Sequence, residues 1–220
     1  MAKALVFDVD GTLVTFHFDV TGTRNALLEE LRKRGLDTSG LGTTTPTQLI
    51  MDAARDQVLS GKSNVDIEEL RAASYRVLDE FEMVGAELAE PFPETRPALE
   101  ELSEAGVRMA VLTNSGRKAA ETVLRRAGIE KFFEFVLTRN EIATMKPRPE
   151  GLRQVLDMLR LPALDVFYVG DSPLDIAAAK AAGVKVISVA TGNYDKERLV
   201  AEGADFVLGS IAEVGSLVRA

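Results

Sequence analysis

The chain of 220 residues contains no cysteine and a single histidine. The lack of cysteine excludes disulfides, thiolate metal ligands and cysteine nucleophiles, and one histidine excludes a histidine-rich zinc site. Positive charge is also scarce, because 26 Lys and Arg face 34 Asp and Glu and leave a formal charge of −8. We therefore expect no nucleic-acid surface, and an anionic ligand needs a local device such as a metal, a lysine or backbone N–H groups.

Long hydrophobic runs are absent as well. No segment approaches the roughly 18 apolar residues that a membrane-spanning helix needs, and the N-terminus leads directly into a short strand that carries Asp8 and Asp10. There is no apolar core of the signal-peptide type. With 46% hydrophobic and 27% charged residues, the sequence predicts a compact protein without membrane partners, and we expect it to be cytoplasmic.

Short apolar runs typical of buried strands recur along most of the chain. They cover residues 4–7, 107–112, 133–137, 166–169 and 184–189, with 205–208 as a possible sixth. Segments with helical spacing lie between them, such as residues 119–127 before Gly128. This alternation predicts an α/β fold with a doubly wound, Rossmann-like parallel sheet, in which ligands bind beyond the carboxyl ends of the strands.

Residues 15–90 interrupt the alternation with three helical segments and no convincing strand. In the second segment, Thr45 is predicted to cap the helix, with Pro46 at the first helical position and Gln48 completing a capping box. We expect residues 15–90 to form a small helical domain, with residues 1–14 and 91–220 forming the core domain. The predicted hinges lie near residues 15–19 and 90–93.

The strongest motif is Asp8-Val9-Asp10-Gly11-Thr12, at the end of the first strand. Two carboxylates two residues apart on an extended chain point to the same side and crowd one site. Such a pair indicates either a shared proton or a bound metal. Taken alone, the motif could equally be a simple turn in which Asp10 bonds to its own backbone.

Three further motifs follow other strands. Each has an ordinary explanation by itself: Thr113 as part of a helix cap, Lys146 as a surface charge, and Asp175 as the partner of a helix N-terminus. Parallel strands nevertheless bring these side chains to one edge of the sheet. The set expected to meet there is Asp8, Asp10, Thr113, Lys146, Asp171 and Asp175. Several carboxylates without cysteine or histidine favour oxygen coordination of Mg²⁺.

The order Asp-x-Asp-Gly-Thr-Leu, Leu-Thr-Asn-Ser, Lys-Pro and Gly-Asp-x-x-x-Asp resembles the haloacid dehalogenase-like hydrolase superfamily over essentially the whole chain. The helical insertion resembles the cap domain of its phosphoglycolate phosphatase-like branch. The resemblance implies a phosphoric monoester phosphatase that acts on a small phosphorylated metabolite.

The same resemblance implies a role for each motif. Asp8 is the expected nucleophile and Asp10 the acid and base. Thr113, the Asn114 amide and Gly11 are expected to line the phosphate site, with Lys146 as the countercharge. The implied Mg²⁺ ligands are Asp8, the backbone carbonyl of Asp10, Asp171 and, directly or through water, Asp175.

The residues leave some alternatives open. Asp10 argues against a dehalogenase, because a halide leaving group needs no proton. A sugar-phosphate mutase of the same fold would keep Asp10 and differ mainly in the inserted domain. A non-catalytic phosphate-binding module would be expected to lose a nucleophile, an acid or a metal ligand, and none is missing here. His17, between Phe16 and Phe18, is interpreted as a packing residue. The substrate stays open among phosphoglycolate, sugar phosphates, nucleotides and pyrophosphate.

Overall fold

The computed structural model describes residues 3–15 and 17–219. It divides into two compact units, one made of Met1–Phe16 with Ala86–Ala220 and the other of His17–Gly85. The helical segments of residues 17–85 are thus inserted between the first and second strands. That this inserted unit acts as a cap domain stays a prediction. Within the described ranges, every helix is too short or too polar to cross a lipid bilayer.

The larger unit is built on a parallel sheet whose order is β3-β2-β1-β4-β5-β6 among the described residues. The strands are β1 Ala4–Phe7, β2 Arg108–Leu112, β3 Val136–Leu137, β4 Val166–Gly170, β5 Lys185–Val189 and β6 Phe206–Leu208. The residues of β1, β2, β4 and β5 are mostly buried and apolar, whereas those of the edge strand β6 are half-buried. Burial of this kind is expected for strands covered on both faces. The predicted doubly wound α/β fold is confirmed.

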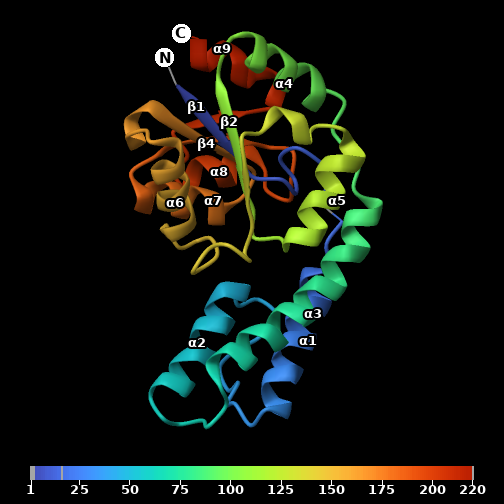
Figure 1. The fold of residues 1–220 in the computed structure, drawn as a ribbon, viewed down its shortest axis with the longest axis vertical. Coiled ribbons are helices and arrows are strands. Elements are labelled where there is room, and N and C mark those ends of the chain that lie inside the picture. Colours follow the sequence, from blue (N-terminus) through green and yellow to red (C-terminus); the bar gives the residue numbers. More distant parts are fainter. Residues whose placement is uncertain (1–2, 16, 220) are drawn as a thin grey trace. The chain divides into compact units, whose positions relative to one another are not determined.

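Helices cover the sheet. They are α4 Thr95–Glu104, α5 Arg117–Ala127, α6 Glu150–Leu159, α7 Pro173–Ala182, α8 Lys196–Ala201 and α9 Val214–Arg219. Helices α6 and α7 contact each other and the central strands, and they lie on the opposite side of the sheet from α5 (Figure 1). Right-handed crossovers explain this, because the chain reverses its direction across the sheet between β3 and β4.

The third strand is shorter than the sequence predicts. The run 133–137 yields only Val136–Leu137, because residues 130–132 form a 3₁₀ turn and the Phe133 N–H closes it onto Glu130 O. Backbone bonds from Glu134 N to Met109 O and from Val111 N to Phe135 O still hold this stretch beside β2. The segment therefore keeps its place at the edge with little regular strand.

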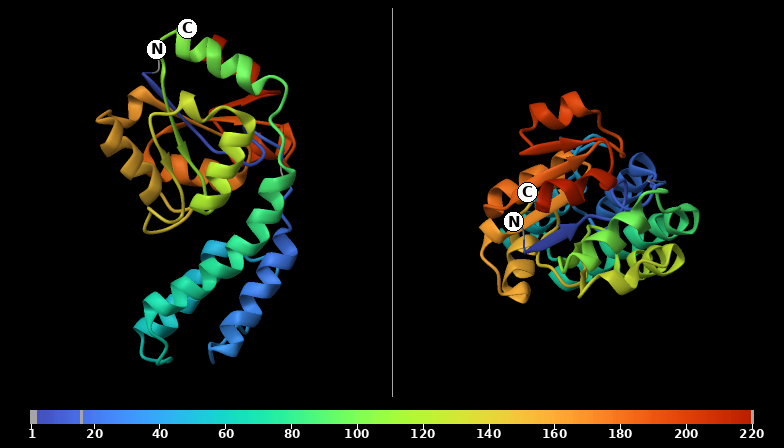
Figure 2. Two further views of the ribbon diagram at one scale, coloured as in Figure 1. Left: turned by 45° about the vertical axis from the view of Figure 1, so that its right-hand side comes forward. Right: turned by 90° about the horizontal axis from the view of Figure 1, so that it is seen from above.

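The smaller unit contains α1 Val20–Lys33, α2 Thr47–Leu59 and most of α3 Ile67–Leu88. Helices α1 and α3 run side by side (Figure 2), and Gly22 approaches the Phe81 ring. This unit has its own apolar core, whose members are Leu27, Leu28, Leu31, Leu36, Ile50, Ala54 and Leu70. An insertion with its own core forms a domain rather than a long loop.

The capping box predicted for α2 is wrong. Pro46 is the N-cap, with φ −53° and ψ 138°, and no side chain caps the helix. Thr45 Oγ1 instead accepts from Gly42 N at 3.1 Å, which closes the preceding turn. Gln48 Nε2 donates to Asp52 Oδ1 at 2.8 Å. The hydroxyl and the amide are thus both used elsewhere, and the helix begins one residue later than predicted.

Replacing Ile50 by Ala should destabilise the smaller unit. Its side chain is 0% exposed, and a cavity of this size in a core costs about 2–5 kcal/mol. Leu59→Ala is the matched control on the same helix, because Leu59 is 69% exposed. Urea titrations followed by circular dichroism measure both changes. Equal losses for the two variants would contradict this description of the core.

Candidate active site

The candidate site lies where the carboxyl ends of the central strands meet. In the sheet register, Phe7 pairs with Val111 on one side and with Val169 on the other. The next residues along the chain are therefore Asp8, Leu112 and Gly170, at the same level of the sheet. Thr113 and Asp171 follow at once, so strand register alone brings these motif residues together.

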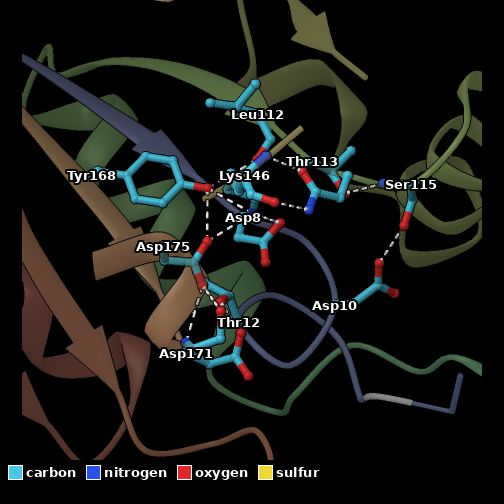
Figure 3. Close-up of polar contacts among 12 residues, drawn as sticks. Asp8, Asp10, Thr12, Leu112, Thr113, Ser115, Lys146, Tyr168, Asp171 and Asp175 are labelled. Carbon is cyan, nitrogen blue, oxygen red and sulfur yellow. Dashed lines mark hydrogen bonds and ion pairs between the residues drawn. The ribbon is translucent and has the colours of Figure 1, made fainter. Parts of the chain in front are cut away.

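Lys146 is the centre of the site. Its Nζ lies 2.7 Å from Asp175 Oδ1 and 2.8 Å from Asp8 Oδ1 (Figure 3). Burial alone would lower the pKa of Lys146, but the charges of Asp175 and Asp8 outweigh it and raise the pKa. The lysine is therefore a permanent cation, 4% exposed, and not the surface charge that it could have been.

Asn114 fixes the backbone of this lysine. Its Nδ2 donates to Lys146 O at 3.0 Å, and its Oδ1 accepts from Lys146 N at 2.8 Å. The sequence assigned Asn114 only a phosphate-binding amide. The structure shows that its side chain joins the segment after β2 to the segment that carries the lysine.

Asp175 is buried and saturated with donors. Its Oδ1 accepts from Lys146 and lies 3.1 Å from the Tyr168 hydroxyl. Its Oδ2 accepts from the N–H of Ser172 at 3.0 Å and from its hydroxyl at 2.6 Å. Asp175 therefore caps the N-terminus of α7 and also faces the site, so the two roles considered for it are compatible. These four contacts occupy the carboxylate and favour an indirect relation to any metal.

Asp8, Asp171 and Asp175 each offer a carboxylate oxygen within 4.8 Å of the others. Burial raises the pKa of Asp8 to about 7, against the attraction of Lys146 and with added repulsion from Asp175. Burial and the charges of Asp175 and Asp8 raise the pKa of Asp171 to about 8. Buried carboxylates that repel one another in this way fit a hard divalent cation, which would lower these pKa values.

Asp10 stands apart from this cluster. Its Oδ2 accepts from Ser115 Oγ at 2.8 Å, and Figure 3 shows it directed toward Ser115. Burial raises the pKa of Asp10, although the bond from Ser115 and the charge of Lys146 oppose the rise. The expectation that Asp8 and Asp10 crowd one point is too simple, because after Asp8 the chain leaves the sheet and turns.

Glycines at the site make room for carboxylates. Gly11 has φ +80°, and a Cβ there would collide with the Asp171 carboxylate. Its N–H donates to Val14 O at 2.8 Å, so this amide is engaged in the turn rather than directed to a ligand. A Cβ at Gly170 would likewise collide with the Asp175 side chain. These glycines shape the acidic cluster.

Sequence reasoning gave no site role to four hydroxyl groups that support these residues. Thr12 Oγ1 lies 3.3 Å from Asp171 Oδ1, and Thr191 Oγ1 donates to Gly11 O at 2.6 Å. Thr12 and Ser115 belong to the first two motifs, and Tyr168 lies within the predicted strand 166–169. A tyrosine inside an otherwise apolar strand was a usable signal, because a buried hydroxyl needs a partner. Thr191 gave a weaker one, as a polar residue just beyond β5.

Thr113 and His17 are the remaining residues that the sequence singled out. Thr113 is 1% exposed, and its Oγ1 accepts from Ser115 N at 3.0 Å, which fixes the turn after β2. The His17 side chain is exposed, so its interpretation as a packing residue finds no support. Phe16, which belonged to the same predicted hinge, lies outside the described residues.

Comparisons with known proteins agree on one family. A family model described as haloacid dehalogenase-like hydrolase matches residues 2–183. A phosphoglycolate phosphatase from Vibrio parahaemolyticus is 30% identical over 98% of this chain and 96% of its own.

Solved structures support the same fold. The crystal structure of a predicted phosphoglycolate phosphatase from Haemophilus somnus 129Pt covers 98% of this chain and 97% of its own, at 21% identity and a TM-score of 0.68. An L-2-haloacid dehalogenase from Xanthobacter autotrophicus covers 100% of this chain and 99% of its own, at 22% identity and a TM-score of 0.58. At these identities the structures show a shared fold alone.

The raised pKa values of Asp8 and Asp171 predict a falling stability with pH for metal-free protein. Between about pH 6 and about pH 9 the folded state holds more protons on these groups than the unfolded state does, so the free energy of unfolding decreases as pH rises. Glu134 and Glu150 have lowered pKa values and are already ionised in this window. Thermal unfolding in EDTA measures the slope.

The Asp171→Asn variant provides the control. It removes one of the repelling charges, so its stability should depend less on pH and its melting temperature at high pH should rise by about 2–4 °C per kcal/mol gained. The stabilisation of the wild type by added Mg²⁺ should also be lost. If the variant keeps the wild-type dependence of stability on pH and is still stabilised by Mg²⁺, the assignment of Asp171 to the metal-binding cluster is refuted.

Proposed function

The chain belongs to the haloacid dehalogenase-like hydrolase family, and we propose that it is a magnesium-dependent phosphatase acting on a small phosphorylated metabolite. The observation that carries this proposal is the buried Lys146 ammonium, placed between Asp8 and Asp175 with Asp171 nearby. Such a site combines a carboxylate nucleophile, a fixed positive charge and an acidic cluster. These are the requirements of phosphoryl transfer, which depends mainly on positioning and charge stabilisation.

Asp8 is the proposed nucleophile. One of its oxygens forms a bond to phosphorus while the bond from phosphorus to the leaving alkoxide breaks, and water then cleaves the aspartyl phosphate. Asp8 must be ionised to attack. The contact with Lys146 favours ionisation, although burial opposes it.

A divalent cation would complete the charge balance. Three ionised carboxylates and one ammonium leave a formal charge of −2 at the cluster, which Mg²⁺ would neutralise. Asp8, Asp171 and the backbone carbonyl of Asp10 would hold it, and it would stabilise negative charge on the phosphoryl oxygens. Asp175, already surrounded by donors, would orient Lys146.

Asp10 is the proposed general acid and base. It would protonate the departing alkoxide and then accept a proton from the attacking water. Its pKa is raised by burial, which suits a group that must carry a proton when the substrate is bound. A halide would need no such proton, so this carboxylate favours a phosphatase over a dehalogenase.

Asp8→Asn should abolish release of inorganic phosphate from p-nitrophenyl phosphate in the presence of Mg²⁺, because an amide oxygen is a poor nucleophile. Asp165→Asn is the matched control, since Asp165 pairs with Lys3 at a position outside the site. The control should retain wild-type kcat and KM. Substantial turnover by Asp8→Asn would overturn the nucleophile assignment.

Asp10→Asn should affect substrates unequally. For an alkyl phosphate such as 2-phosphoglycolate, kcat/KM should fall by about 10²–10⁴-fold, which is the usual contribution of general acid catalysis. For p-nitrophenyl phosphate the fall should be much smaller, because p-nitrophenolate leaves without a proton. Equal losses on both substrates would argue against Asp10 as the acid.

The substrate is best identified by comparing kcat/KM over 2-phosphoglycolate, sugar phosphates, nucleoside monophosphates and pyrophosphate. The name of the Vibrio parahaemolyticus relative makes 2-phosphoglycolate the first choice. Conversion of one sugar phosphate to its isomer in the presence of a bisphosphate would instead identify a mutase. A failure to release phosphate from any compound, with Mg²⁺ binding intact, would identify a non-catalytic module.

A further inference from the structure

We propose that Tyr168 is a positioning residue, which holds the Lys146 ammonium in the orientation that a substrate phosphoryl group requires. The proposal rests on the function proposed above. It extends that function to a residue in the middle of β4, whereas the motif residues lie beyond strand ends. Tyr168 is 0% exposed, so its hydroxyl acts only on its protein neighbours.

The contacts of the ammonium account for all three of its hydrogens. Among the described residues its acceptors are Asp175 Oδ1 at 2.7 Å, Asp8 Oδ1 at 2.8 Å and the Tyr168 hydroxyl at 2.9 Å. Figure 3 shows the tyrosine hydroxyl entering the site beside the lysine and Asp175. An ammonium with three acceptors in fixed positions has a defined orientation as well as a defined place.

The tyrosine hydroxyl is itself held in place. Because its oxygen accepts from Lys146, its single proton is directed to Leu112 O at 3.0 Å or to Asp175 Oδ1 at 3.1 Å. Leu112 ends β2 directly before Thr113, and Asp175 lies in the first turn of α7. The hydroxyl therefore ties the lysine to one of two fixed segments of the core, the end of β2 or the first turn of α7.

The chemistry of the acceptor matters. A third carboxylate at this position would draw the ammonium away from Asp8 and cancel more of its charge. A neutral phenol occupies one hydrogen without adding negative charge, so the cation stays available on the Asp8 side, where the phosphoryl group would arrive. Without the hydroxyl, a buried N–H of Lys146 would lose its acceptor and the ammonium would turn toward the carboxylates.

The test is Tyr168→Phe, which keeps the ring and removes only the hydroxyl. Calorimetric titration with inorganic phosphate in Mg²⁺ should show binding weakened by about tenfold, in line with the loss of a hydrogen bond to a charged group. The value of kcat/KM should fall by a similar factor for both p-nitrophenyl phosphate and 2-phosphoglycolate, because the ammonium acts on phosphoryl oxygens that both share. This pattern differs from that expected of Asp10→Asn.

Ser188→Ala is the matched control for the loss of a buried hydroxyl from the same sheet. Within the part of the chain that the structure describes, Ser188 Oγ on β5 has no hydrogen-bond partner. The control should bind phosphate and turn over substrate as the wild type does. Thermal unfolding checks that each variant folds, and failure of Tyr168→Phe to fold would assign the hydroxyl to core stability and overturn the proposal.

A double-mutant cycle tests whether Tyr168 acts through Lys146. Adding Tyr168→Phe to Lys146→Ala should change phosphate affinity by less than about twofold, because a residue that acts through Lys146 has no effect once the ammonium is gone. The same loss in both backgrounds, or no loss in the wild-type background, would overturn the proposal. Retained turnover by Asp8→Asn would instead refute the proposed function, so the two failures are distinguishable.

Discussion

The ion pairs of Lys146 are the interaction on which the site depends. A buried ammonium is stable only with anionic or polar partners around it, and Asp8, Asp175 and Tyr168 supply them at 2.7–2.9 Å. Each partner comes from a different part of the chain, so one cation fixes the end of β1, the middle of β4 and the start of α7 relative to one another. Removing it would leave several buried carboxylates uncompensated.

The fold places these groups before any side chain contributes. Parallel strands in register end at one level, and Asp8 and Asp171 occupy the residues just beyond them. Glycines then remove the obstacles, because a Cβ at Gly11 or Gly170 would occupy the space of a carboxylate. The acidic cluster is therefore strained electrostatically while it is well accommodated sterically. A divalent cation would relieve the electrostatic part.

Apolar periodicity in the sequence predicted the alternation of strands and helices, although β3 is shorter than predicted. Asp8, Lys146, Asp171 and Asp175 lie together at the strand ends, whereas Asp10 contacts Ser115 instead. The sequence did not predict the partners of those motifs. Tyr168 lies within an apolar run, and its hydroxyl becomes informative only when the lysine 22 residues away is seen beside it. Likewise, Thr45 looked like a helix cap, but its hydroxyl closes a turn onto Gly42. Local patterns identify which residues are polar, whereas tertiary structure decides which polar group they contact.

The two aspartates of the first motif differ because their partners differ. Asp8 faces a permanent cation, which favours its charged form against the effect of burial. Asp10 receives a hydrogen bond from the neutral hydroxyl of Ser115 and lies farther from the acidic cluster. A carboxylate beside a cation is suited to attack phosphorus, and one beside a hydroxyl is freer to exchange a proton. The division of labour that we propose between nucleophile and acid thus rests on what each side chain contacts after the strand ends.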